Sequence, residues 1–223
     1  MKVILTGVTG FIGREILDQC LQNPSISSIV ALSRRELQPP VTSNSKVKVV
    51  VMEDFLVYPK PVLQEISGAE ACIWALGKAR MPDNETSRKV SIDYTLAAVQ
   101  AFEQNFLSTP EGGKKFRFVY LSGAGAEKDQ EKALWVMQDY RHIRGEVENK
   151  LLSYAKDHEP RLESYIMRPG MVLSKEMTIR SLVFGLGPSV KVDALAKVMI
   201  DLALHGNERQ VLENNDICEH ELH

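Results

Sequence analysis

The sequence predicts an α/β fold in which helices cover both faces of one doubly wound parallel sheet, built as a single domain over residues 1–223. Three observations predict this fold. An apolar run leads directly into three glycines, strand-like apolar segments then alternate with segments of helical period, and 44% of the 223 residues are hydrophobic. That hydrophobic content is enough for one core, and no second substrate domain fits the length.

The first 13 residues, MKVILTGVTGFIG, have the pattern of a strand, a tight turn and the start of a helix. Residues 3–5 are apolar on both faces, as in a central parallel strand. Gly7, Gly10 and Gly13 suit a turn that packs a helix tightly on a strand and brings backbone N–H groups close to a phosphate. Glycines also occur in ordinary turns, but this context favours a Rossmann-type pyrophosphate turn. The cofactor residues expected at this turn are Gly7, Thr9, Gly10, Phe11, Ile12 and Gly13.

Apolar runs and helical periodicity alternate along the rest of the chain, which is typical of repeated βαβ units. The further strands are expected at 29–33, 47–52, 71–76, 116–122 and 164–168. The crossover helices are expected within 88–106 and 131–156. A last amphipathic helix is expected at 194–203, so that the segment from about 164 to 205 completes the substrate cleft and 206–223 forms a polar tail.

Composition excludes several classes of partner. With 27 basic and 29 acidic residues the formal net charge is −2, so nothing indicates binding to nucleic acid or to an anionic membrane surface. No apolar run approaches the roughly 20 residues of a membrane span, and a cytoplasmic location is the default expectation. Cys20, Cys72 and Cys218 lack a CxxC pattern, so we expect neither a disulfide framework nor a metal site. Trp74 and Trp135 are expected in the core or in a pocket wall.

The residues after the second expected strand bear on the choice of nucleotide. A chain that selects NAD usually has an acidic residue there to bind the adenosine ribose, whereas this chain has Ser33, Arg34 and Arg35. Two guanidinium groups can bind a 2′-phosphate through charge-assisted hydrogen bonds, which favours NADP(H). The alternative is a solvated pair of loop arginines, one of them neutralised by Glu36.

Residues that follow the next three strands are further candidates. Asp54 and Phe55 could meet the edge and the ring face of an adenine, or could simply pack a loop. The segment 75–77 could bring backbone close to a ribose or to the nicotinamide, or could mark an ordinary strand end. The segment 121–125 could form the floor of a substrate pocket or a tight turn. The cofactor residues expected at these strand ends are Asp54, Phe55, Ala75, Leu76 and Gly77.

Tyr140 and Arg144 lie four residues apart in an expected helix, so they share one helix face. A phenol with an ordinary pKa of about 10 protonates a carbonyl well only if a neighbouring cation stabilises its phenolate. Arg144 can supply that charge, which makes the pair a candidate reaction centre. The alternative is an amphipathic helix with Tyr140 in the core and Arg144 in solvent.

Six segments in this order resemble the short-chain dehydrogenase/reductase superfamily over nearly the whole chain: GVTGFIG, SRR, ALG, YLSGAGA, YRHIRGEVE and MRPG. The likeness is to the atypical or extended branch, and within it to the Tat-interacting-protein-like group of single-domain NAD(P)-binding proteins. That group combines a glycine-rich turn for NADPH with an arginine pair, a YxxxKGEVE helix and an RPG strand end. The GEVE and RPG segments are the most specific.

The resemblance implies that Tyr140 is the general acid and that the residues after Pro169 close over the nicotinamide. Together with the strand-end positions, the resemblance gives a set of residues expected to hold the cofactor: Gly7, Gly10, Gly13, Arg34, Arg35, Leu76, Gly77, Tyr140, Arg144, Pro169 and Val172.

Two positions depart from the family pattern. Arg144 stands at the position of the family's lysine, where it keeps the charge and can bond the nicotinamide ribose but relays a proton poorly. The family's serine is Ser122 or lies just beyond it, where the chain has Gly123 and Ala124. The catalytic residues expected are Tyr140, Arg144 and Ser122.

Three functions are compatible with these motifs. The first is NADP(H)-dependent oxidation or reduction of a small carbonyl or related substrate. The second is an NADP(H)-binding regulatory or interaction protein without turnover, and the third is an isomerase or dehydratase in which the nucleotide is redox-silent. A protein partner, or pairing of two copies through the Tyr140 helix, is also compatible. The loops expected to shape the substrate site are 78–88 and 174–188.

Overall fold

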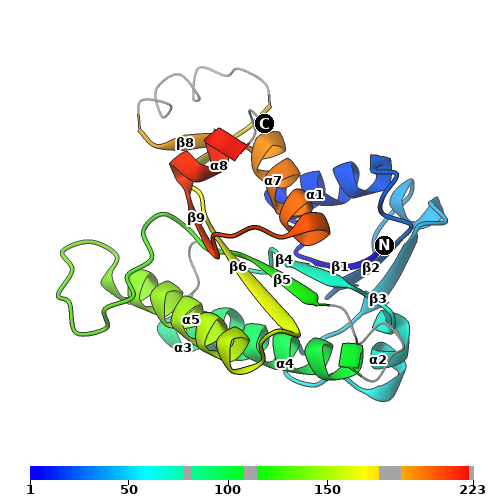
Figure 1. Cartoon of the computed structure of the whole chain (residues 1–223), viewed down its shortest axis with the longest axis horizontal. Helices are drawn as coiled ribbons and strands as arrows, with labels where there is room; N and C mark the ends of the chain where they lie inside the picture. The colour runs from blue at the N-terminus through cyan, green and yellow to red at the C-terminus, as the bar shows by residue number, and fades with distance from the viewer. Residues whose placement is uncertain (78–81, 108–114, 176–186, 221–223) are drawn as a thin grey trace.

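The computed structural model describes residues 1–77, 82–107, 115–175 and 187–220. A seven-stranded parallel sheet in the order β3-β2-β1-β4-β5-β6-β9 forms its centre, with helices on both faces (Figure 1). The strand order reverses between β1 and β4, as it does in a doubly wound sheet, and this is the point where such folds bind ligands. The predicted fold class is confirmed.

The strands are short, and most of them are buried on both faces. Those of the large sheet are β1 (Lys2–Thr6), β2 (Ser28–Ser33), β3 (Val47–Val51), β4 (Ala71–Trp74), β5 (Phe116–Leu121), β6 (Leu162–Arg168) and β9 (Val211–Glu213). In the centre, Leu5 of β1 pairs with Ala31 of β2 on one side and with Ile73 of β4 on the other. A separate parallel pair consists of β7 (Met171–Leu173) and β8 (Ser189–Lys191).

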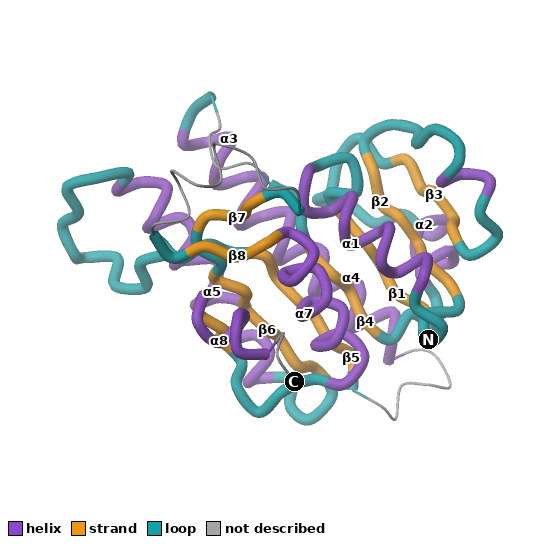
Figure 2. Tube along the Cα trace, turned by 90° about the horizontal axis from the view of Figure 1, so that it is seen from above, coloured by secondary structure: helices purple, strands orange, loops and turns teal. Residues whose placement is uncertain are grey.

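The helices divide between the two faces of the sheet (Figures 1 and 2). On one face lie α1 (Phe11–Gln22), α7 (Val192–His205) and α8 (Asn214–His220). On the other lie α2 (Lys60–Ile66), α3 (Asn84–Arg88), α4 (Tyr94–Leu107) and α5 (Gln138–Asp157). The described residues also form a short 3-10 helix, η1 (Val41–Ser43), and a short π-helix, η2 (Lys89–Asp93). One apolar cluster fills the space under each set of helices, so the sheet has a core on both sides.

Helix α5 begins at Gln138, later than the predicted start at 131. Residues 126–137 instead form a loop that is fixed to the helix: the Glu127 N–H donates to the Arg141 carbonyl at 2.9 Å. Gly145 permits this contact, because a Cβ on it would lie 1.6 Å from the Glu127 carbonyl oxygen. Met137, with φ 53°, turns the chain into the helix. The predicted helix at 88–106 is likewise divided, because the π-turn η2 separates α3 from α4.

Residues 206–220 differ from the predicted polar tail. They form β9, which extends the sheet beside the end of β6, and α8, which packs on the face that carries α7. Ile217 of α8 is fully buried in the apolar cluster of that face. The Asp201 carboxylate of α7 accepts a hydrogen bond from His220 of α8 at 2.7 Å. Short elements in a polar segment have too few apolar residues to show a period.

The two tryptophans have opposite environments. Trp74 is fully buried and packs against Phe55 and Phe118 in the core. Trp135 is fully exposed at 101% of its reference area, in the loop of residues 126–137, so its predicted place in the core or a pocket wall is wrong. Trp135 lies in the apolar run 134–137, which is too short for its periodicity to assign the residue to a face.

Two of the three cysteines are buried in the core. These are Cys20 and Cys72, and burial raises the pKa of the Cys20 thiol to about 12, so it is not a thiolate at neutral pH. Within the ranges that the structure describes, no helix combines the length and the apolar character needed to cross a membrane.

Candidate functional site

The glycine-rich turn lies where the strand order reverses, and two of its glycines have no room for a side chain. Gly7 has φ +69°, and a Cβ on it would lie 2.2 Å from the Ala75 carbonyl oxygen after β4. A Cβ on Gly13 would lie 2.1 Å from the carbonyl oxygen of Gly7. The Gly10 N–H donates to that same oxygen at 2.8 Å and closes the turn. The turn therefore places the N-terminus of α1 directly against the end of β1.

The N-terminus of α1 is open to a ligand. Gly10 is the N-cap and has no side chain to accept from the first-turn N–H groups, and no acidic residue lies in the first turn. Thr9 and Phe11 on either side are exposed. Free N–H groups at the positive end of a helix bind phosphate, so these residues fit the pyrophosphate of a dinucleotide.

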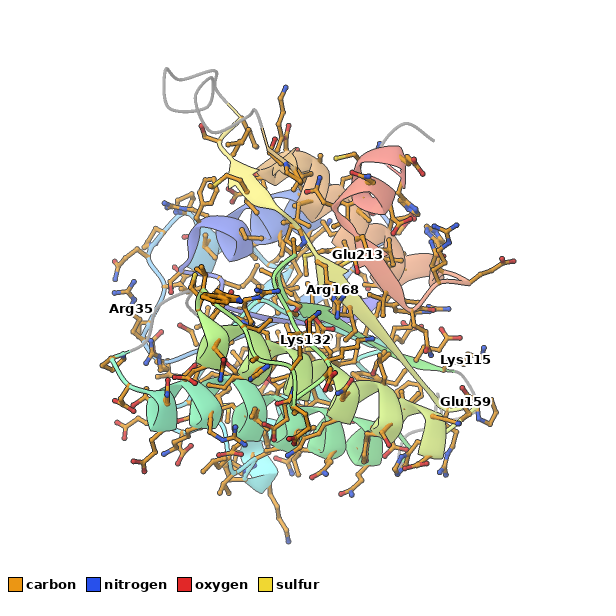
Figure 3. The ribbon with its side chains drawn as sticks, turned by 90° about the vertical axis from the view of Figure 1, so that its left-hand side faces the viewer. Arg35, Lys115, Lys132, Glu159, Arg168 and Glu213 are labelled. Atoms are coloured by element: carbon orange, nitrogen blue, oxygen red, sulfur yellow. The ribbon has the colours of Figure 1, made fainter. Side chains whose placement is uncertain are left out.

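The arginine pair follows β2 on the same edge of the sheet. Arg34 and Arg35 are both exposed, and among the described residues neither forms an ion pair, including with Glu36. Ser33 is buried, and its hydroxyl accepts from the Arg35 N–H at 3.3 Å, which shapes the turn that carries the two side chains. In Figure 3, Arg35 lies at the left margin of the molecule, away from Arg168 and Glu213 near the middle of the view. Both guanidinium groups are available to an anion.

The expected adenine contacts are only partly available. Asp54 is exposed, and one of its carboxylate oxygens accepts from the Leu56 N–H at 3.0 Å. Phe55 is fully buried, with its ring centroid 6.0 Å from that of Trp74 and 5.7 Å from that of Tyr94. The predicted stacking of Phe55 on an adenine is therefore wrong, because its ring face belongs to the core. Tyr94 is half-buried near Asp54, and burial and the Asp54 charge raise the pKa of its phenol.

The end of β4 connects the glycine turn to helix α5. The Ala75 N–H donates to the buried Thr6 hydroxyl at 3.1 Å, which joins the ends of β1 and β4. Gly77 has φ +149°, and a Cβ on it would lie 3.3 Å from Nη2 of Arg144. The predicted segment 75–77 thus lies between the turn and the predicted reaction centre, with Leu76 half-buried between them.

Tyr140 and Arg144 form a pair on one face of α5, as their spacing predicts. The Arg144 guanidinium carbon lies 5.4 Å from the centroid of the Tyr140 ring, a cation–π distance. The Tyr140 hydroxyl lies over the strand-end loop, 3.6 Å from where a Cβ on Gly123 would be. The alternative of an amphipathic helix placed Tyr140 in the core and Arg144 in solvent. The structure has the opposite arrangement, since Arg144 is 6% exposed whereas Tyr140 is half-buried.

Arg144 is a buried cation whose described partners are neutral oxygens. Its Nη1 donates to the Tyr120 hydroxyl at 2.8 Å and to the Leu121 carbonyl at 3.3 Å. Its Nε is buried without a hydrogen-bond partner. Burial opposes the charge, but the phenols of Tyr120 and Tyr140 outweigh it and raise the pKa of the guanidinium above its ordinary value. The group therefore keeps its charge, and its orphaned N–H suits a ribose hydroxyl of a bound dinucleotide.

The hydroxyl of Ser122 is not oriented as its predicted catalytic role requires. It is 8% exposed, and its hydroxyl donates to the Glu148 carboxylate at 2.5 Å. Glu148 is fully buried and also accepts from Arg168 at the end of β6, with 3.0 Å from Nε to each carboxylate oxygen. The Ser122 proton is thus directed into the contact between β5 and α5 rather than toward a substrate.

The remaining predicted residues lie near the end of β6. Pro169 is buried, and its carbonyl accepts from the Ala124 N–H at 2.9 Å, so it supports the loop beneath Tyr140. Val172 is half-buried in β7 and pairs with Val190 of β8. Ile12 is half-buried in the first turn of α1. The expected substrate loops at 78–88 and 174–188 lie partly outside the described residues, which omit 78–81 and 176–186.

Sequence reasoning missed the contacts that Tyr120, Glu148 and Arg168 make beside this site. Tyr120 is a buried strand residue whose hydroxyl needs a polar partner, which is the only signal it carries. Glu148 lies in the GEVE segment and Arg168 in the RPG segment. Their spacing along the chain does not indicate that the two side chains are bonded to each other. Their contact joins segments that are far apart in sequence.

A family described as NAD(P)H-binding matches residues 7–205. The chain belongs to this family. The match spans the glycine turn, the arginine pair, α5 and α7. The motif-based resemblance to the short-chain dehydrogenase/reductase superfamily is confirmed by this match and by the fold.

Several solved structures share the fold at low sequence identity. Serine dehydrogenase from Escherichia coli has a TM-score of 0.71 and 13% identity, with 96% of each chain covered. A short-chain dehydrogenase from Burkholderia cenocepacia in complex with NADP has a TM-score of 0.71 and 15% identity, covering 98% of this chain and 91% of that one. Gre2 from Candida albicans in complex with NADPH has a TM-score of 0.69 and 17% identity, over 96% of this chain and 77% of that one.

Curated relatives are closer in sequence. Leucinostatins biosynthesis cluster protein T from Purpureocillium lilacinum is 32% identical over 164 residues, which are 73% of this chain; the match spans 55% of that relative's length. Protein FMP52, mitochondrial, from Saccharomyces cerevisiae is 25% identical, with 98% of this chain and 96% of that protein covered.

The predicted cytoplasmic location is contradicted by these relatives. The proteins from Saccharomyces cerevisiae, Candida albicans, Aspergillus niger and Neurospora crassa, at 25–26% identity, are all named as mitochondrial. The prediction rested on composition and on the absence of a recognised address in the sequence, and neither of these determines where a protein is delivered.

Proposed function

We propose that the protein is an NADP(H)-dependent oxidoreductase that acts on a small carbonyl or related substrate. The observation that carries the proposal is the Arg144 guanidinium, buried at 6% exposure beneath the Tyr140 ring and beside Gly77. A buried charge without a carboxylate partner is costly for a fold to keep. At this place it is useful, because it stabilises a phenolate on Tyr140 and offers an N–H to the ribose of the cofactor.

The residues suggest how the chain would reduce a carbonyl. When bound, the nicotinamide supplies the hydride. The Tyr140 hydroxyl donates its proton to the carbonyl oxygen, and Arg144 holds the negative charge that develops on the phenol. The glycine turn and the N-terminus of α1 hold the pyrophosphate, which fixes the cofactor relative to Tyr140.

Arginine in place of lysine changes how Tyr140 regains its proton. Arg144 stays charged throughout, since its pKa is raised above an already high ordinary value, so it cannot pass on a proton. Tyr140 is half-buried rather than enclosed, which lets water reprotonate it directly. The proposed reaction therefore needs no relay through the helix.

The choice of NADP(H) over NAD(H) rests on Arg34 and Arg35. Both are exposed at the end of β2, and neither is neutralised by an acidic neighbour among the described residues. Two guanidinium groups at this position provide the charge-assisted hydrogen bonds that a 2′-phosphate requires.

The test is oxidation of NADPH with a panel of aldehydes and ketones, followed at 340 nm in the wild type and in Tyr140→Phe. We expect turnover in the wild type and a loss of about a hundredfold or more in Tyr140→Phe, with a much smaller change in the dissociation constant for NADPH. Tyr154→Phe is the matched control, since Tyr154 lies on the same helix with its hydroxyl bonded to Glu103. Equal turnover in wild type and Tyr140→Phe would remove Tyr140 from the mechanism.

One observation favours a second candidate, an NADP(H)-binding protein without turnover. The only serine of the 121–125 segment, Ser122, has its hydroxyl bonded to Glu148, so it does not polarise a substrate carbonyl. Cofactor binding does not depend on that hydroxyl. Tight binding of NADPH, together with no turnover over the whole carbonyl panel, would establish this candidate in place of the first.

A further inference from the structure

Helix α5 carries two buried opposite charges one turn apart. Arg144 and Glu148 are 6% and 0% exposed, and their spacing of four residues puts them on the same face as Tyr140. Oppositely charged groups at this spacing normally pair, and the attraction grows in a buried environment. Yet the described hydrogen bonds of Arg144 go to the Tyr120 hydroxyl and the Leu121 carbonyl, and its ring contact is with Tyr140, so no carboxylate is among these partners.

Glu148 is instead held on its other side by Arg168. Nε of Arg168 donates to both carboxylate oxygens at 3.0 Å, and its Nη2 also contacts Glu148. The Ser122 hydroxyl provides a further hydrogen bond at 2.5 Å. Both carboxylate oxygens are therefore engaged by Arg168 of β6, and one of them also by Ser122, which directly follows β5.

Arg168 is in turn oriented from the edge of the sheet. Its Nη1 donates to Glu213 of β9 at 2.8 Å, and Figure 3 shows the two side chains next to each other. Glu213 is half-exposed, with 51% of its side chain accessible, so this outer contact directs the guanidinium rather than neutralising it in the core. The sequence of contacts runs from Glu213 through Arg168 to Glu148.

We propose that Arg168 is a positioning residue that holds Glu148 away from Arg144 and thereby keeps the charge of Arg144 available to the bound dinucleotide. This inference deepens the proposed function and rests on its cofactor site, but it concerns binding and does not need turnover. Without Arg168, the buried Glu148 carboxylate can pair with Arg144, which lies one turn earlier on the same helix face.

The surroundings of Tyr120 agree with this arrangement. Tyr120 is fully buried between the two groups: burial raises the pKa of its phenol, Arg144 lowers it and Glu148 raises it. Both charges thus act on one phenol while only Arg144 is bonded to it. Glu148 is close enough to influence the Tyr120 phenol, but it is not bonded to Tyr120 or to Arg144.

The test is the dissociation constant for NADPH, measured by the fluorescence of the bound nucleotide, in four variants. Arg168→Met should weaken binding about tenfold or more, since Glu148 then neutralises Arg144, and Arg144→Met should weaken it by a similar factor. Glu148→Gln alone should bind nearly as the wild type. The double variant Glu148→Gln with Arg168→Met should recover most of the affinity lost in Arg168→Met, because no carboxylate remains to reach Arg144.

Recovery in the double variant separates electrostatic positioning from support of the fold. If the pair only braced β6 against α5, the double variant would bind as weakly as Arg168→Met, and that result would overturn the inference. Wild-type affinity in Arg168→Met would also overturn it, as would a wild type that binds neither NADPH nor NADH. A wild type that binds but never turns over would sink the oxidoreductase proposal and leave this one standing.

Arg117→Met provides the matched control. Arg117 of β5 pairs with Glu163 of β6 near the ends of these strands opposite to Arg168, with 3.2 Å between Nε and Oε2. Its loss removes a comparable ion pair and should leave NADPH affinity unchanged. If Arg168→Met does not fold, Glu213→Gln releases the guanidinium from its outer side; we expect a smaller loss of affinity, again reversed by Glu148→Gln, and no loss would count against the inference.

Discussion

A single missing Cβ at Gly7 determines whether the cofactor turn can form. Replacement by alanine places a methyl group 2.2 Å from the Ala75 carbonyl oxygen and forces a side chain into φ +69°. We expect Gly7→Ala to lower the free energy of unfolding by about 2 kcal/mol or more, because left-handed strain adds to a backbone collision. We also expect it to abolish NADPH binding, since Ala75 and Gly7 would have to separate. Urea unfolding and nucleotide fluorescence measure the two effects.

Gly68 supplies the control for that substitution. Its φ of +74° matches that of Gly7, but nothing lies within 4 Å of the position of its missing Cβ. Gly68→Ala should therefore cost about 1 kcal/mol from backbone strain alone and leave NADPH affinity unchanged. Equal destabilisation in the two variants would mean that the close approach to Ala75 contributes nothing.

Individual residues also show which parts of the site the sequence could predict. The pairing of Tyr140 with Arg144 follows from helical geometry, so it was predictable, but the burial of Arg144 was not. Helical spacing assigns residues to a common face and does not say which face is covered. The covering group here is Tyr120, which reaches Arg144 only because β5 lies beneath α5. The prediction for Phe55 was wrong for the same reason, since its position after a strand does not indicate that its ring points into the core.

At the scale of elements, β9 and α8 belong to the core and are not a tail. Ile217 of α8 is fully buried against the apolar cluster on the α7 face. We expect Ile217→Ala to lower the free energy of unfolding by about 2 to 5 kcal/mol, the range for truncating a buried aliphatic side chain. Val57→Ala is the control, because Val57 is 67% exposed and should change stability by less than about 0.5 kcal/mol. An Ile217→Ala effect as small as that would return the segment to the status of a tail.

The elements predicted most readily are those with enough apolar residues to show a pattern. The strands near 29–33 and 116–122 and the helix at 194–203 have enough apolar residues for their pattern to be read, and they appear within a few residues of those bounds. The start of α5 was misplaced because its sequence suits a helix from 131, whereas the contact of Glu127 with Gly145 and Arg141 draws that stretch into a loop. A tertiary contact outweighed local propensity there.

The charge of the whole molecule bears on how it selects a nucleotide. A formal net charge of −2 gives no long-range attraction for a polyanion, so any preference for NADPH over NADH must come from the local charges of Arg34 and Arg35. Exposed charges of this kind are screened by salt, and the Debye length falls from about 10 Å at 0.1 M to about 3 Å at 1 M. The preference of the wild type should therefore shrink as the ionic strength rises across that range.

Replacing both arginines tests this origin of selectivity. Arg34→Gln with Arg35→Gln should weaken NADPH binding about tenfold or more, leave NADH binding nearly unchanged and remove the salt dependence of the ratio between them. Lys156→Gln with Arg161→Gln makes the same change of two charges at exposed positions near the end of α5 and the start of β6, away from the cofactor edge. That control should keep the wild-type ratio at every salt concentration, because a local contact and not the total charge distinguishes the nucleotides. If both double variants lowered the affinity for NADPH equally, the general field of the protein would be the cause and the arginine pair would lose its assigned role.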